Sequence, residues 1–99
     1  MALFVMIGTD HPPHSMPLRD SIRPEHRDYV LGNAGKIRLA GAFVDGQDNQ
    51  CGTMLVFEAD SAEEVWDWIR AEPFYKAGVY ADMQVRAWNL VIGAIAPRS

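Results

Sequence analysis

The chain opens on a strongly apolar segment, residues 2–8, whose apolar side chains occupy both alternating sets of positions. Leu3, Val5 and Ile7 would line one face of a strand, and the apolar residues between them would line the other. A strand that is apolar on both faces is usually covered on both. Two helices in so short a chain can cover one face of a sheet, so we expect a second copy of the chain on the other.

The remaining pattern predicts a Pro-rich loop, a helix, a strand pair, a second helix, a short connector and a last strand. The loop is expected over residues 9–19, and the first helix after it, with Pro24 in its first turn and a stop at Gly32. The strand pair is expected at 36–44 and 51–58 around a polar turn, the second helix at 61–72, the connector at 74–80 and the last strand at 82–92.

The second helix carries the clearest local signals. Ser61 begins a capping box that predicts the helix start. Val65, Trp66 and Ile69 follow at helical spacing and predict its buried stripe, with Trp68 off that stripe.

This element order, βαββαβ, is typical of the ferredoxin-like α+β fold, a four-stranded antiparallel sheet with both helices on one face. The length of 99 residues fits a single domain over residues 1–99, and we expect the tail from about Gly93 to be loosely ordered. The open sheet face favours a homodimer.

Composition narrows the classes of partner. Nine Lys and Arg against thirteen Asp and Glu give a net charge of −4, and no basic stripe of the kind that nucleic-acid binders carry is present. The longest apolar runs are too short for a membrane helix. A single cysteine, Cys51, cannot form an internal disulfide, which favours the cytoplasm.

Three side chains near the first helix could act on a small molecule. His26 lies on the apolar stripe of that helix, where a histidine can move protons near neutral pH or simply be a hydrogen-bonded core residue. Arg19 and Arg23 flank the junction of loop and helix, where guanidinium groups could hold a carboxylate or phosphate, or pair with nearby aspartates.

The Pro-rich loop offers a second cluster, because Asp10, His11 and His14 carry ligand types that suit zinc. His26 would complete a three-histidine site if it joined them. The alternative is a polar loop at the mouth of a pocket, with no cofactor at all.

Several segments resemble the YciI-like (YCII-related) family. They are Arg23-Pro24-Glu25-His26, Gly41 at the second strand, the segment of residues 72–79 and Arg19 before the helix. The resemblance implies a dimeric α/β barrel with a catalytic His–Asp pair. The histidine corresponds to His26 and the aspartate to Glu72, where this chain departs from the family by one methylene.

We therefore hypothesise a small cofactor-free enzyme of the lyase, isomerase or elimination type, acting on a small anionic or aromatic metabolite. His26 and Glu72 would be catalytic, and Arg19, Arg23 and Gly41 would bind the substrate. The alternatives are a non-catalytic ligand-binding or accessory module and a metal-binding protein.

Overall fold

Four antiparallel strands form the sheet on which the rest of the molecule is built. In the computed structural model, which describes residues 2–33 and 35–95, they lie in the order β2-β3-β1-β4. Their bounds are Ala2–Asp10 for β1, Ile37–Val44 for β2, Gln50–Ala59 for β3 and Tyr80–Trp88 for β4. This is the ferredoxin-like arrangement that the element order predicted, and the prediction is confirmed.

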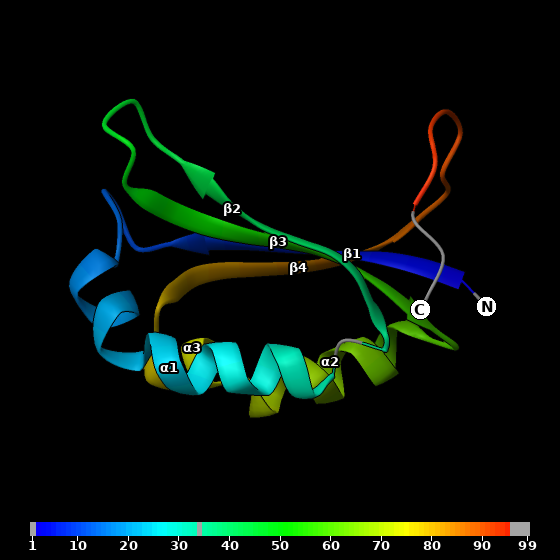
Figure 1. The fold of residues 1–99 in the computed structure, drawn as a ribbon, viewed down its shortest axis with the longest axis horizontal. Helices are drawn as coiled ribbons and strands as arrows, with labels where there is room; N and C mark the ends of the chain where they lie inside the picture. Colours follow the sequence, from blue (N-terminus) through cyan, green and yellow to red (C-terminus); the bar gives the residue numbers. More distant parts are fainter. Residues whose placement is uncertain (1, 34, 96–99) are drawn as a thin grey trace.

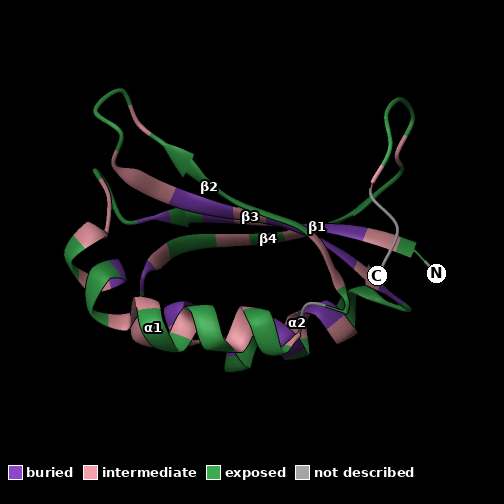
Figure 2. Ribbon diagram, in the orientation of Figure 1, coloured by how far each residue is buried: buried purple, intermediate pink, exposed green. Residues whose placement is uncertain are grey.

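Three helices cover one face of the sheet (Figure 1). They are α1, Met16–Gly32, α2, Ala62–Ala71, and α3, Pro73–Ala77. Between α2 and the sheet lies the core, formed by alternate residues of the central strands and by one face of the helix; it contains Phe4, Met6, Leu55, Phe57, Val65, Trp68 and Ile69. Figure 2 shows the buried residues along β1 and β3, whereas β2 is largely exposed.

Helix α1 begins earlier than predicted, because two prolines act differently from the expectation. Pro17 occupies the first turn, where the missing N–H is not needed. Pro24, expected in the first turn, lies inside the helix, and the hydroxyl of Ser21 donates to the carbonyl of Leu18 within the same helix. The helix therefore starts at Met16, and the predicted long loop shrinks to residues 11–15.

Helix α2 starts as predicted, and Val65 and Ile69 lie on its buried face as predicted, but the assignment of the two tryptophans was wrong. Ser61 accepts a hydrogen bond from the backbone N–H of Glu64 at 3.2 Å. Trp68 is buried in the core, whereas Trp66 is only partly buried, with the guanidinium of Arg70 5.9 Å from its ring centre. Residues 65, 68 and 69 form the stripe, which is the i, i+3, i+4 pattern of one helix face.

The last strand is shorter than predicted, since β4 ends at Trp88 and residues 89–95 leave the sheet (Figure 1). Of the tail that we expected to be loosely ordered, residues 96–99 lie outside the described part of the chain. Over the described residues, no helix is both long enough and apolar enough to cross a membrane.

The sheet face opposite the helices carries apolar side chains that are unevenly covered, together with Glu58, Gln84 and Arg86, which pair with Leu3, Ile7 and Val5. At its centre, Val5 and Val56 are already buried by neighbours in the same chain. Toward its edges Leu39, Phe43 and Trp88 keep 40–48% of their surface exposed. The expectation of a two-sided apolar strand thus holds for β1, and the exposed apolar area lies mainly on the flanking strands.

Candidate active site

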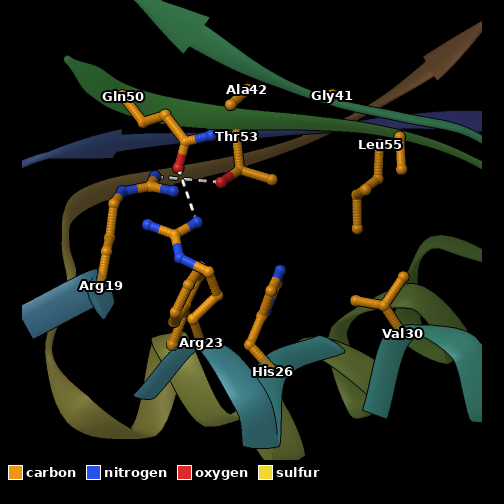
Figure 3. Close-up of a pocket in the computed structure, with 11 residues that line it drawn as sticks. Arg19, Arg23, His26, Val30, Gly41, Ala42, Gln50, Thr53 and Leu55 are labelled. Carbon is orange, nitrogen blue, oxygen red and sulfur yellow. Dashed lines mark hydrogen bonds between the residues drawn. The ribbon is translucent and has the colours of Figure 1, made fainter. Parts of the chain in front are cut away.

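One face of α1 and the inner face of β3 enclose a cavity of about 200 Å³. Arg19, Arg23, His26 and Val30 recur at helical spacing, so all four side chains rise from α1 toward the sheet (Figure 3). The opposite wall and the sides of the cavity are formed by Ala40, Gly41, Ala42, Gln50, Thr53, Leu55 and Phe74.

Glu72 lies between α2 and α3, outside this lining. Pro73 cannot continue α2, and Glu72 takes an extended conformation, with φ −75° and ψ 130°. Its buried carboxylate accepts hydrogen bonds from the backbone N–H of Phe74 at 3.0 Å and of Tyr75 at 3.2 Å. The predicted second helix, over residues 61–72, ended with Glu72 in its last turn. In fact it caps the positive N-terminus of α3.

The same carboxylate holds His26. Glu72 Oε1 is hydrogen-bonded to His26 Nδ1, and the imidazole stacks on the ring of Phe74 with 3.7 Å between ring centres and 6° between planes. Because an ionised carboxylate only accepts, Nδ1 carries the proton of this bond, and in the neutral imidazole Nε2 has the lone pair. Figure 3 shows a ring nitrogen at the tip of His26, directed toward the strands.

Arg19 is buried in an ion pair at the back of the cavity. Its Nε lies 2.7 Å from Asp10 Oδ2 and its Nη2 lies 2.8 Å from Asp10 Oδ1. Burial acts to lower the pKa of the guanidinium, but the hydrogen bond and the charge of Asp10 outweigh it, so that the pKa is raised. Arg19 also lies 5.1 Å from the ring centre of Phe74. Much of its bonding capacity is therefore used within the protein.

Arg23 spans the mouth of the cavity. Its Nη1 donates to Gln50 Oε1 at 2.9 Å and its Nη2 donates to Asp20 at 2.8 Å. The sequence also allowed Arg23 to pair with a nearby aspartate, and the structure shows this ion pair with Asp20. Gly41 lies on β2 at the cavity wall, and a Cβ added there would meet no atom within 4 Å.

The structure does not bring the loop cluster together as a metal site. Asp10 forms an ion pair with Arg19, and His11 is exposed. His14 Nδ1 accepts a hydrogen bond from the backbone N–H of Met16 at 3.2 Å. Across residues 2–33 and 35–95, no three His, Cys, Asp or Glu side chains are grouped to hold an ion.

Two polar groups of the site were missed from the sequence. Thr53 accepts hydrogen bonds from Arg19 Nη2 at 3.1 Å and from the Tyr80 hydroxyl at 2.8 Å. Burial is the main cause that raises the pKa of Tyr80. The available signal was alternation: Thr53 shares the inner face of β3 with Leu55 and Phe57, where a polar residue is unusual.

A sequence profile of the YCII-related domain family matches residues 2–89. The chain belongs to this family. Protein YciI of Escherichia coli O6:H1 is 31% identical over 97 residues, covering 90% of this chain and 98% of that protein, and protein YciI of Shigella flexneri matches equally well.

Solved structures share the fold. The chain resembles 5-chloro-2-hydroxyhydroquinone dehydrochlorinase (TftG) of Burkholderia phenoliruptrix AC1100, solved in complex with 2,5-dihydroxybenzoquinone, with TM-score 0.79, 30% identity, and coverage of 88% of this chain and 93% of that one. An antibiotic biosynthesis monooxygenase has TM-score 0.57 at 17% identity, covers 93% of this chain and 100% of that one, and supports the fold alone.

The phenol of Tyr80, which is partly buried and hydrogen-bonded to Thr53, predicts a specific loss of stability in alkali. A tyrosine of the unfolded chain ionises near pH 10, whereas folded Tyr80 resists ionisation, so its contribution is present below about pH 10 and is lost as pH rises. We expect Tyr80→Phe to be less stable than wild type at neutral pH but to lose less stability between about pH 8.5 and 11. Urea unfolding at several pH values measures both, with Tyr75→Phe, at an exposed ring, as control. If the free energy of unfolding fell equally with pH in wild type and in Tyr80→Phe, the raised pKa would not belong to Tyr80.

Proposed function

We propose that the chain is a small enzyme that transfers a proton at a small, planar, anionic metabolite, with His26 as the acid/base group and Glu72 as the residue that orients it. The observation that carries the proposal is the hydrogen bond between His26 Nδ1 and the buried carboxylate of Glu72, which also accepts two backbone N–H groups. This bond leaves Nε2 on the cavity side. A general base needs this arrangement: a fixed ring, a fixed tautomer and one nitrogen open to the substrate.

The polarity of the cavity supports an anionic ligand. Around the end near Arg23 the lining offers guanidinium, amide and hydroxyl donors, and the lining residues include no Asp or Glu. The two nearby buried carboxylates, Asp10 and Glu72, are held by Arg19 and His26. The ligand is thus expected to supply hydrogen-bond acceptors, and the guanidinium of Arg23 is best placed to donate to them at the mouth of the cavity.

The other end of the cavity is apolar and fits a ring. Val30 and Leu55 contribute their side chains there, and Ala40, which pairs with Leu55, leaves space beside β2. A flat molecule with an oxygen-rich edge would place that edge at the donors and its carbon face on these residues.

An elimination is the reaction that these groups support best. In the keto tautomer of the ring, where the carbon that bears the leaving group is tetrahedral, His26 Nε2 would take a proton from a hydroxyl or carbon, the released electron pair would form a double bond, and the leaving group would depart with its own electron pair. The ring would lose HX, and no outside oxidant or reductant is needed. The similarity to TftG, a dehydrochlorinase, supports this reaction type. A cytoplasmic location, expected from the single cysteine, belongs to the same proposal.

The role of His26 is tested by measuring chloride release from 5-chloro-2-hydroxyhydroquinone. Related halogenated and unhalogenated hydroxylated or carboxylated ring compounds are assayed for turnover in parallel. We expect wild-type turnover, and a loss of about 10²- to 10⁴-fold in kcat in His26→Gln, because loss of a general base typically costs this much. The matched control is His14→Gln, whose imidazole lies in the loop of residues 11–15 and accepts a backbone N–H.

Turnover that is unchanged in His26→Gln would show that this histidine moves no proton in the reaction. Saturable binding of the ring acids without any turnover in wild type would favour the second reading from the sequence, a non-catalytic ligand-binding module that uses the same pocket.

We also propose that the protein is a homodimer that pairs through the open sheet face. Leu39, Phe43 and Trp88 are exposed there, and Val91 and Ile92 of the following segment are 81% and 90% exposed. Figure 1 shows that segment projecting to the side of the sheet away from the helices, the side on which a second copy would lie. Apolar area of this extent on one face is unusual for a monomer.

The dimer predicts a mass of twice 11.1 kDa by light scattering at micromolar concentration. Leu39→Glu should shift the mass toward the monomer, because it places a charge in the apolar interface. Leu31→Glu, at a leucine of α1 that is 65% exposed, is the matched control and should leave the mass unchanged. A wild-type monomer would contradict the proposal.

A further inference from the structure

Thr53 lines the cavity, and its hydroxyl makes two described hydrogen bonds, one with Arg19 and one with Tyr80. Its hydroxyl lies on β3 opposite α1 and lines the cavity (Figure 3). Arg19 Nη2 lies 3.1 Å and the Tyr80 hydroxyl 2.8 Å from Thr53 Oγ1. The residue is 5% exposed, so the direction of its own proton is decided by these neighbours.

The two neighbours occupy the acceptor positions of this hydroxyl. A guanidinium can only donate, so the bond from Arg19 uses one lone pair of Oγ1. If Tyr80 also donates, the second lone pair is used, and the single Thr53 proton must point in a third direction. The opposite polarity, with Thr53 donating to Tyr80, would leave the phenolic proton with no acceptor among the described residues, which is costly for a partly buried group.

Asp10 fixes this arrangement from further back. Its carboxylate holds Arg19 through Nε and Nη2 and also accepts the backbone N–H of Ser15 at 3.1 Å. Arg19 therefore cannot turn away from Thr53 without breaking a buried ion pair. The chain Asp10–Arg19–Thr53–Tyr80 is held at both ends by packed elements, β1 and β4.

We propose that Thr53 is a ligand-binding and specificity-determining residue, whose hydroxyl proton is directed into the cavity and donates to a carbonyl or phenolate-type oxygen of the bound ring, while Arg19 and Tyr80 position it. This inference rests on the proposed function and adds a residue to it. A donor whose own lone pairs are already filled discriminates strongly, because it can bind an acceptor but cannot accept from a hydroxyl that donates.

The ligand side is tested with 2,5-dihydroxybenzoquinone as the probe, titrated calorimetrically into the folded protein. Thr53→Val keeps the shape and removes the hydroxyl, so we expect affinity to fall about tenfold or more. Thr53→Ser restores the hydroxyl and should bind within about threefold of wild type. Thr9→Val, at an exposed threonine of β1, is the matched control and should not change affinity.

The direction of the proton is tested without any ligand. A neutron crystal structure of the wild-type protein should show the deuterium of Thr53 Oγ1 directed into the cavity and that of Tyr80 directed at Thr53. Deuterium on the line from Thr53 to the Tyr80 oxygen would overturn the inference, as would wild-type affinity in Thr53→Val. Absence of probe binding by wild type at millimolar concentration would overturn the ligand role. Thr53-dependent binding without any chloride release contradicts the proposed function alone.

Discussion

The carboxylate of Glu72 is the contact on which the arrangement of the site depends. It stands at the junction that Pro73 forces between α2 and α3, where two backbone N–H groups of the new helix point at it. The same carboxylate binds Nδ1 of His26 on α1. One side chain thereby joins α1 to α3 and fixes one imidazole. The ring of Phe74, in the first turn of α3, supports the flat face of that imidazole.

A second buried carboxylate plays the corresponding part on the sheet side. Asp10, at the end of β1, holds Arg19, and Arg19 in turn reaches Thr53 on β3. Both carboxylates are thus used behind the cavity, and the lining presents mainly donors and apolar carbon. Burying the Asp10–Arg19 ion pair and the carboxylate of Glu72 in so small a protein contributes little to net stability. We interpret these buried charges as the cost of holding His26 and Thr53 in single orientations.

Much of the fold follows from the sequence because alternation and helical spacing are local signals. The strand order and the start of α2 at Ser61 were predictable in this way. The start of α1 was not predictable. A proline suits the first turn of a helix, and it also occurs inside a helix that tolerates one missing backbone hydrogen bond. The local pattern therefore cannot choose between Pro17 and Pro24 as the residue of the first turn. This choice matters, since only the longer helix places Arg19 and His26 on one face.

The site itself was predictable only in part. His26 was indicated by its place on the apolar stripe of the first helix, and Glu72 was named as its partner only through the resemblance to a family. The structure brings them into contact although glutamate replaces the aspartate. The roles of Asp10 and Thr53 depend on pairings across the sheet, which no local pattern contains. Asp10 resembled a metal ligand beside two histidines until the position of Arg19 was known.

The measurement that tests this account most directly is the tautomer of His26, read from its ¹⁵N chemical shifts by NMR in wild type and in Glu72→Gln above the pH at which the ring is protonated. The account predicts that wild type carries the proton on Nδ1, facing Glu72, and that the variant, whose amide can donate as well as accept, shows a mixture of both tautomers. A proton found on Nε2 in the wild-type protein would contradict it, because the nitrogen that faces the cavity would then have no lone pair with which to act as a base.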